Sequence, residues 1–213
     1  MNFPAVLNII GHVIKYELLL LIIPFLVALY YGQGDASAFL YTILIMIPIY
    51  IVLTRIKGKN KAIYTKEGFV TVGLAWIAIS FFGALPFIFS GTIPSIIDAF
   101  FETSSGFTTT GASILTEVQS LPKGILFWRS FTHWVGGMGF LIFILALMPS
   151  FNGNTIHLLK AESPGPTPGK IVPKIKQTAK ILYAIYFVLT VIQTILLKIA
   201  GMSWYDSILH ALG

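Results

Sequence analysis

Three long segments of this chain carry almost no charged side chains, and this absence restricts the fold more than any other feature. Residues 18–53 contain one acidic and no basic residue, and residues 68–97 and 131–157 contain no Asp, Glu, Lys or Arg. About 18 apolar residues suffice to cross a hydrocarbon core about 30 Å thick. Because 56% of the 213 residues are hydrophobic and 10% are charged, an ordinary soluble domain is excluded. The sequence predicts an all-α membrane protein.

The apolar segments predict five spanning helices, at residues 3–31, 37–53, 68–90, 124–148 and 178–200. The first is expected to be a retained helix, since it lacks the basic start and the small-residue cleavage site of a signal peptide. Lys15 and Glu17 interrupt it, and side chains two residues apart do not face each other on a helix. We therefore expect both to snorkel toward a membrane surface.

Most of the basic residues lie in two segments between predicted helices. Ten of the 14 Lys and Arg residues are Arg55, Lys57, Lys59, Lys61, Lys66, Lys160, Lys170, Lys174, Lys176 and Lys180. Such clusters mark cytoplasmic loops, so the N-terminus is predicted to be cytoplasmic. No aromatic residues alternate with these charges, and a nucleic-acid partner is not expected. The absence of Cys excludes disulfides, thiolate metal ligands and thiol catalysis.

A short apolar segment at residues 95–105 is predicted to be a re-entrant helix. It has about a dozen residues, or roughly 18 Å of helical rise, which is too short to span a bilayer. The two basic clusters lie on either side of residues 68–148. Two full spans and one helix that dips in and returns leave both clusters on the cytoplasmic side, whereas three full spans would not.

The short helix leads into a loop of small and hydroxyl-bearing residues, Thr103–Ser113. Irregular backbone inside a membrane is tolerated only where it is buried in protein or lines a water-filled path. Carbonyl and hydroxyl oxygens in such a place can replace the hydration shell of an ion, and Gly111 permits backbone angles that a side chain penalises. The alternative is an ordinary polar turn outside the bilayer.

Two carboxylates of the short helix have alternative roles. Asp98, in its first turn, complements the positive end of the helix dipole, which we prefer to a role as an ion ligand. Glu102 lies one turn later and either braces the loop from behind or faces the ion path.

Three features of the following helix also leave alternatives open. Arg129 pairs with Glu102 or Glu117, or faces the outer water. His133 has no neighbours at metal-ligand spacing, so a buried and satisfied imidazole is preferred to a proton relay or metal site. Gly136, Gly137 and Gly139 lack the context of a nucleotide-binding fingerprint and are interpreted as sites of close helix packing.

An internal repeat with an offset of 108 residues is suggested by two identities. Ser95 aligns with Ser203, and Asp98 aligns with Asp206. The order of basic cluster, spanning helix, short turn and short helix recurs with them, as in many membrane transport proteins. A second loop would begin near position 214, so we interpret the chain as the front portion of a longer protein.

Several strings together resemble the TrkH/KtrB superfamily of potassium uptake proteins, and in particular its TrkH-like membrane subunits. The resemblance covers essentially all 213 residues. The strings are Gly-Ala-Leu-Pro-Phe-Ile-Phe (83–89), Asp-Ala-Phe-Phe-Glu (98–102), Gly-Phe-Thr-Thr-Thr-Gly-Ala (106–112), Trp-Val-Gly-Gly-Met-Gly (134–139) and Ala-Glu-Ser-Pro-Gly-Pro (161–166).

The resemblance implies four covalently linked helix–pore loop–helix repeats, related to potassium channels, around one ion path. It divides the chain into an N-terminal transmembrane hairpin (1–54), a cytoplasmic basic loop (55–67), a first repeat (68–148), a cytoplasmic linker (149–177) and the start of a second repeat (178–213). The family's selectivity filter falls on Thr108, Thr109, Thr110, Gly111 and Ala112, with Gly106, Glu102 and Asp98 as supporting residues.

The same resemblance implies potassium uptake across the bacterial inner membrane. Potassium is the substrate, and no cofactor or other metal is expected in this chain. The implied partners are a second copy, forming a homodimer, and a peripheral cytosolic nucleotide-binding regulatory subunit of the TrkA type. Family proteins carry three further filter segments and a gating loop beyond this length, so transport by these 213 residues alone is not expected.

No catalytic triad, metal-ligand cluster or phosphate-binding loop occurs in the sequence, and an enzyme is not expected. Two other functions remain as alternatives to a potassium pathway. One is a secondary carrier that binds another small substrate at the broken segment. The other is a membrane-embedded assembly module without a pore of its own.

Overall fold

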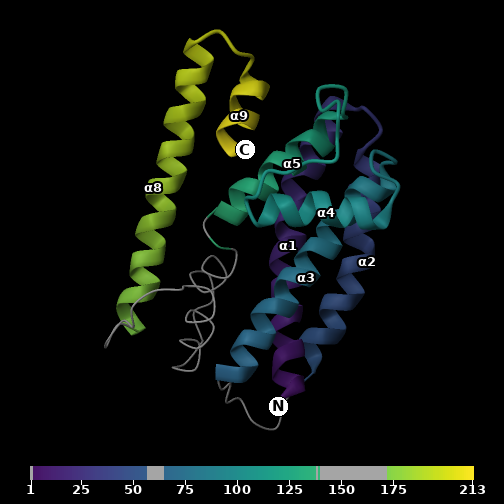
Figure 1. The fold of residues 1–213 in the computed structure, drawn as a ribbon, viewed down its shortest axis with the longest axis vertical. Helices are drawn as coiled ribbons and strands as arrows, with labels where there is room; N and C mark the ends of the chain where they lie inside the picture. The colour runs from purple at the N-terminus through teal and green to yellow at the C-terminus, as the bar shows by residue number, and fades with distance from the viewer. Residues whose placement is uncertain (1, 57–64, 138, 140–171) are drawn as a thin grey trace.

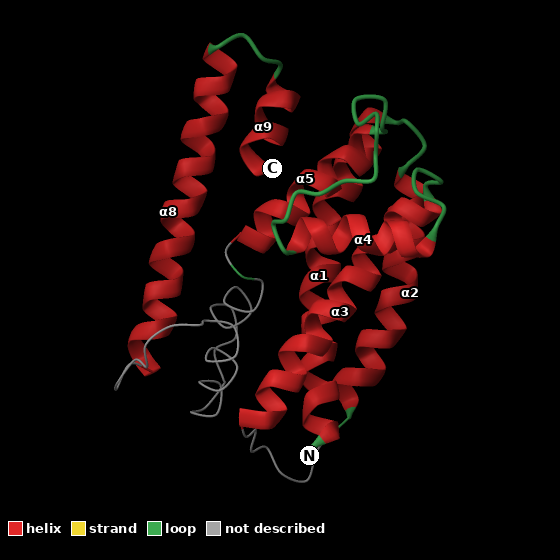
Figure 2. Cartoon of the chain, viewed as in Figure 1, coloured by secondary structure: helices red, strands yellow, loops and turns green. Residues whose placement is uncertain are grey.

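The computed structural model describes residues 2–56, 65–137, 139 and 172–213, and within these ranges all regular secondary structure is helical (Figures 1 and 2). The helices are α1 (Phe3–Tyr31), α2 (Ala36–Arg55), α3 (Thr65–Phe89), α4 (Ile96–Phe107), α5 (Lys123–Gly137), α8 (Val172–Ile199) and α9 (Trp204–Leu212). Four of them, α1, α2, α3 and α8, are long and apolar enough to cross a membrane. The predicted all-α membrane fold is confirmed.

The first three helices form a bundle, with α1, α2 and α3 packed side by side (Figure 1). Gly11 lets α1 approach α2 closely, because a Cβ built there would lie 2.7 Å from the Cβ of Leu53. Beside it, the Asn8 amide donates a hydrogen bond of 2.8 Å to the carbonyl of Thr54. The helices bury Phe39, Met46 and their neighbours between them and leave many large apolar side chains exposed on their outer faces, as lipid-facing helices do.

The short helix α4 runs across the bundle instead of along it (Figure 1). Its N-terminus is capped by Ser95, whose Oγ accepts the Asp98 N–H at 3.4 Å. The chain then returns to the end of the bundle from which α4 came. There Lys123 N–H donates to Gln33 Oε1 (2.6 Å), and Ile125 N–H donates to Asp35 Oδ2 (3.1 Å). Because both acceptors lie in the turn between α1 and α2, the chain enters and leaves on one side, as the charge pattern predicts.

The helix that follows is shorter than predicted. An uninterrupted span over residues 124–148 was expected, but α5 ends at Gly137, and Gly139 has a φ of 67°. A residue in that left-handed conformation cannot continue a right-handed helix, so the prediction of one continuous helix is wrong at this point. Residues 140–148, most of the basic loop (57–64), and the linker with Ala161–Pro166 (up to residue 171) lie outside the described residues.

The last two described helices repeat the local pattern of α3 and α4. Ser203 caps α9 by accepting the Asp206 N–H at 3.1 Å, which is the same capping contact as between Ser95 and Asp98. The short helix α9 docks on the start of α5, where the Tyr205 hydroxyl donates to the Lys123 carbonyl and the Lys123 ammonium lies 4.6 Å from the Tyr205 ring centre. The cap geometry therefore supports the offset of 108 residues seen in the sequence.

Replacement of Asp35 by Ala is expected to destabilise the protein by about 1–2 kcal/mol, because the buried N-terminus of α5 loses a side-chain acceptor. Asp35 is 3% exposed, and a Cβ at Gly124 would lie 2.4 Å from its Oδ2, so its carboxylate packs directly against the start of α5. Thermal unfolding of the purified protein measures the effect. Asp35→Asn keeps an acceptor and is the control; equal melting temperatures for Asp35→Ala and wild type would contradict the capping role.

Candidate functional site

The predicted filter residues lie at the C-terminal end of α4, in a loop from Thr108 to Ser113 whose residues are all exposed. The helix runs two residues further than the predicted 95–105, so Gly106 and Phe107 belong to α4 and not to the loop. The reason is tertiary packing. A Cβ at Gly106 would lie 2.2 Å from Thr132 Oγ1, which means that the last turn of α4 sits directly against α5.

The backbone of this loop turns its N–H groups toward the end of α4. Thr109 N–H donates to the Gly106 carbonyl (2.9 Å), while the N–H groups of Thr110 and Gly111 donate to the Ser105 carbonyl (2.9 and 3.5 Å). The described peptide bonds are all trans, and the N–H and C=O of a trans peptide point in opposite directions.

The carbonyls of Thr108, Thr109 and Thr110 must therefore point away from α4, toward the exposed side of the loop. Among the residues that the structure describes, no hydrogen bond ends on these three carbonyl oxygens. They form a short row of unused acceptors. Such a row is what a dehydrated cation needs as a replacement for its water shell.

Two residues of the loop have left-handed backbone conformations. Gly111 has a φ of 74°, and Thr109, with a φ of 56°, is the only residue other than glycine with a positive φ in the described part of the chain. For a side-chain-bearing residue this conformation costs roughly 1–2 kcal/mol. A Cβ at Gly111 would meet no atom within 4 Å. Glycine is therefore required there by its backbone angles, and not by lack of space.

The threonine hydroxyls of the loop brace it. Thr108 Oγ1 donates to the Ser104 carbonyl at 2.7 Å and lies 2.9 Å from Thr110 Oγ1. Ala112 has no polar side-chain atom to offer. The acceptor oxygens that this loop leaves unused are thus those of the backbone, while the hydroxyls of Thr108 and Thr110 hold its shape.

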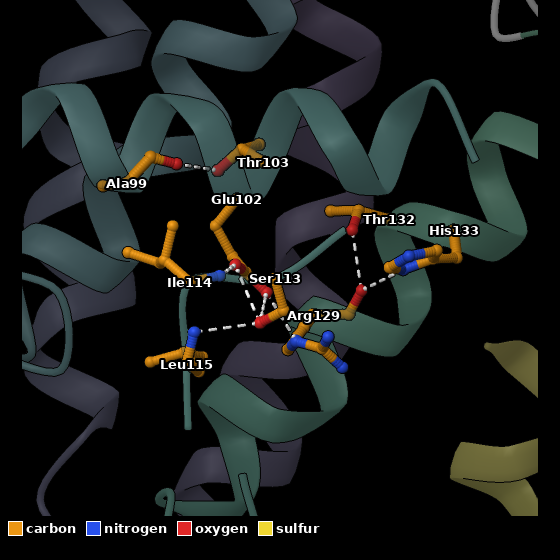
Figure 3. Close-up of polar contacts among 9 residues, drawn as sticks. All are labelled: Ala99, Glu102, Thr103, Ser113, Ile114, Leu115, Arg129, Thr132 and His133. Atoms are coloured by element: carbon orange, nitrogen blue, oxygen red, sulfur yellow. Dashed lines mark hydrogen bonds and ion pairs between the residues drawn. The ribbon is translucent and has the colours of Figure 1, made fainter. Parts of the chain in front are cut away.

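Glu102 holds the loop from behind (Figure 3). Its carboxylate, 3% exposed, accepts hydrogen bonds from Ser113 Oγ (2.9 and 3.0 Å) and from the Ile114 N–H (3.1 Å). On its other side it pairs with Arg129, whose Nε lies 2.7 Å from Glu102 Oε1. Of the two roles considered for Glu102, these contacts are those of a residue that braces the loop from behind. It joins the helix, the return of the loop and α5 through one buried side chain.

The main-chain carbonyl of Arg129 contacts two side chains that follow it in α5. The Thr132 hydroxyl donates to the Arg129 carbonyl at 2.7 Å, and His133 Nδ1 lies 3.0 Å from the same oxygen. Of the alternatives for Arg129, the structure shows the pairing with Glu102. His133 is half-buried and partnered by this backbone contact. Among the described residues no group of three or more His, Cys, Asp or Glu side chains could hold a metal ion.

The remaining predicted supporting residue, Asp98, lies far from the loop. It is exposed in the first turn of α4, and ten residues of helix, or about 15 Å of rise, separate it from Thr108. A contact with an ion in the 108–113 loop is excluded by this distance. Its position suits the interaction with the positive end of the helix dipole, worth about 0.3–1 kcal/mol.

One protein family matches most of this chain. The family model described as TrkH, a cation transport protein, matches residues 36–210, which is most of the chain. The chain belongs to the TrkH family.

Members of the TrkH family resemble the chain over its whole length. The Trk system potassium uptake protein TrkH of Escherichia coli (strain K12) is 41% identical over 214 residues, covering 99% of this chain and 44% of that protein. An uncharacterized cation transporter of Methanocaldococcus jannaschii is 34% identical over 207 residues, covering 97% and 43%. The chain thus spans less than half the length of these relatives.

A solved TrkH structure has the same fold. The crystal structure of the potassium transporter TrkH from Vibrio parahaemolyticus matches all of this chain and 42% of its own, with a TM-score of 0.78 and 32% sequence identity. The predicted resemblance is confirmed by these matches. The TrkH family consists of membrane transport proteins, so the chain is a membrane protein from a transport family and not an enzyme.

Two buried carboxylates of this TrkH-family chain were not recognised from its sequence. Glu17 was expected to snorkel to a membrane surface, yet it is 0% exposed at the centre of α1, and that prediction is wrong. Lys15, expected to do the same, is exposed. Asp35 was given no role in the sequence analysis, whereas it caps α5. The signal for Glu17 was its position, since it is the middle residue of a 29-residue helix and cannot reach either end.

Proposed function

We propose that the chain is part of a potassium uptake protein and that residues 108–112 form one wall of its selectivity filter. The observation that carries the proposal is the row of unused carbonyl oxygens on Thr108, Thr109 and Thr110, directed away from α4 by the hydrogen bonds on their opposite faces. Backbone carbonyls bind a potassium ion strongly enough to dehydrate it and weakly enough to let it leave. The names of similar proteins, among them a Trk system potassium uptake protein and a potassium transporter, support the choice of ion.

The electrostatics of α4 favour a cation at the same place. The C-terminal end of a helix carries a partial negative charge equivalent to about half an electron, and this end directly precedes the loop. The Glu102 carboxylate lies behind the loop, neutralised by Arg129 at 2.7 Å. The loop therefore attracts a cation through carbonyl dipoles and not through a full negative charge, which suits an ion that has to be released.

One such wall does not surround an ion. The loop residues are exposed in the described part of the chain, so we propose that further walls come from outside these 213 residues and that the unit of the second wall includes α9. We extend the proposal to the division of the chain into a hairpin (1–54), a basic loop (55–67), a first repeat (68–148), a linker (149–177) and a second repeat from 178. Four such repeats complete the path.

The proposal includes the surroundings of the protein. We place it in the bacterial inner membrane with the N-terminus and both basic clusters in the cytoplasm, because basic residues gather on that side. The membrane potential, about 2.3 kcal/mol per charge per 100 mV, then draws potassium inward. A homodimer and a TrkA-like nucleotide-binding subunit on the cytosolic side are the proposed partners, and the chain needs no cofactor.

Replacement of Gly111 by Ala in the full-length protein is expected to abolish selective rubidium uptake, because Ala strains the left-handed conformation that orients the carbonyls. Uptake into vesicles, with sodium as competitor, measures the effect. Gly91→Ala is a matched control: its φ is 73°, and a Cβ there would also meet no atom within 4 Å, but it lies in the turn before α4. Equal losses in both variants would contradict the filter.

The alternative functions give different results in the same system. A secondary carrier shows counterflow and competition by a substrate other than a monovalent cation. An assembly module keeps its cytosolic partner bound but shows no uptake in wild type or in any variant.

A further inference from the structure

Glu17 is a buried acid that the proposed ion path does not use. It is the middle residue of α1, and its side chain is 0% exposed. Within the part of the chain that the structure describes, neither of its two carboxylate oxygens has a hydrogen-bond partner. This distinguishes it from Glu102, which is equally buried but has three donors around it.

Among the side chains that the structure describes, no positive charge compensates Glu17. The basic and imidazole side chains described on α1 and on the helices packed against it are His12, Lys15, Arg55, Lys123, Arg129 and His133. Lys15 and Arg55 are exposed, Lys123 lies over the Tyr205 ring, and Arg129 pairs with Glu102. His133 contacts the Arg129 carbonyl. None of the six, nor the α2 phenols Tyr41 and Tyr50, forms a hydrogen bond or ion pair with Glu17 among the described residues.

The other nearby acids do not share its site. Glu67 of α3 lies at the N-terminal end of α1, where its Oε1 accepts the Asn2 N–H at 3.3 Å. Asp35 is used at the start of α5. An ionised carboxylate without donors or a counter-charge is unfavourable in an apolar interior, and such a group becomes neutral by taking up a proton.

The carboxyl group of Glu17 lies against the point where α3 carries the filter helix. A Cβ built on Gly83 would lie 3.1 Å from Glu17 Oε1, 2.8 Å from Thr103 Cγ2 and 3.0 Å from Phe107 Cε2. The Gly83 carbonyl also accepts a hydrogen bond of 2.8 Å from Trp128 Nε1–H. Thr103 and Phe107 belong to the last two turns of α4, and Phe107 directly precedes Thr108. The Glu17 carboxyl group thus lies where α3 packs against the last turns of α4.

We propose that Glu17 binds a proton in the folded protein, and that this proton keeps α1, α3 and the end of α4 in contact around Gly83. Loss of the proton draws water to Glu17, separates α4 from α3 and disturbs the loop that follows Phe107. The structure thus assigns a proton site to α1, behind the proposed filter and distinct from it. This inference goes beyond ion conduction, and its first two readouts need no transport.

The first experiment observes the proton directly. Infrared spectra of the full-length protein in membranes are expected to show the carbonyl band of a protonated carboxylic acid at neutral pH. The band should be missing in Glu17→Gln and unchanged in Glu117→Gln, which alters an exposed glutamate of the loop before α5. A Glu17→Gln spectrum that keeps the same band would overturn the proposal.

The second experiment uses the linkage between proton binding and stability. A group that takes up a proton on folding stabilises the folded state at low pH and loses this contribution as the pH rises. The melting temperature of the wild type should therefore fall between pH 5 and pH 8 relative to that of Glu17→Gln, with the two values closest at pH 5. A constant difference between the two proteins at every pH would overturn proton binding.

Rubidium uptake tests the connection to α4. With equal pH on both sides of the vesicle membrane, wild-type uptake should decrease as the pH is raised, and Glu17→Gln uptake should change less. Identical pH profiles, in a protein whose infrared band is lost in Glu17→Gln, would overturn the connection to the filter helix. An absence of uptake in the wild type would instead count against the proposed function and leave the infrared and thermal results in force.

Discussion

Replacement of Glu102 by Ala is expected to lower the stability of the protein by about 3 kcal/mol, because Arg129 loses its partner and the loop loses two hydrogen bonds. Removal of one member of a buried ion pair costs about 3–5 kcal/mol, and the lower end applies since the Arg129 side chain is 19% exposed. The Ser113 hydroxyl and Ile114 N–H are released together, so rubidium uptake should be lost as well. Thermal unfolding and vesicle uptake of the full-length protein measure the two effects.

A double-mutant cycle separates the ion pair from the bracing of the loop. Arg129→Met removes the charge and leaves Glu102 bonded to the loop, while the double variant Glu102→Ala/Arg129→Met leaves no unpaired charge. Contacting pairs couple by about 0.5–3 kcal/mol, so the double variant should be less destabilised than the two single effects together. Its uptake should still be absent, because the loop remains without its brace. Normal uptake in Glu102→Ala would show that the brace is not needed.

Replacement of Gly136 by Ala is expected to have an effect at least as large, because the added methyl group collides with backbone. A Cβ at Gly136 would lie 2.1 Å from the Phe107 carbonyl oxygen and 2.7 Å from the Phe107 carbonyl carbon. Overpacking usually costs about 1–3 kcal/mol and more where the surroundings cannot yield. Here α5 has to move away from α4, so we expect a loss of about 3 kcal/mol and of rubidium uptake.

Gly73→Ala is the matched control for this variant. Gly73 is also helical, but a Cβ there would meet no atom within 4 Å. The same substitution should then stabilise the protein slightly, by about 0.5–1 kcal/mol, since Ala loses less conformational freedom than Gly in a helix. Melting temperatures of the two alanine variants should move in opposite directions. Equal shifts would show that α4 and α5 do not need their close approach.

Local features of the fold could be predicted from the sequence to within a few residues. The first helix was predicted at residues 3–31 and is found at Phe3–Tyr31, because a long and mainly apolar segment in a membrane has to satisfy its backbone hydrogen bonds within itself. The short helix was predicted to begin at Ser95, and the cap found there uses the Ser95 hydroxyl. Capping depends on neighbours three residues apart, and so is written in the local sequence.

The candidate site was predicted in its residues but not in its shape. The Thr-rich loop and Gly111 were recognised, whereas the extension of α4 through Phe107 was not, because it depends on the contact of Gly106 with Thr132 across 26 residues of chain. The role of Glu102 could not be decided from the sequence either, because it also depends on contacts between residues far apart in the chain. Its partners, Ser113, Ile114 and Arg129, are brought to it only when the loop and α5 fold back over α4.

The sequence by itself determined that this chain is helical, lies in a membrane and carries a broken segment between two basic clusters. These properties follow from hydrophobicity, charge and hydrogen bonds between near neighbours. Only the tertiary structure decided that Glu102 pairs with Arg129 and that Asp35 caps the N-terminus of α5. It also decided that Glu17 is enclosed without a hydrogen-bond partner among the described residues. The surroundings of a charged side chain come from other helices that pack against it, and the sequence of its own helix does not show which helices these are.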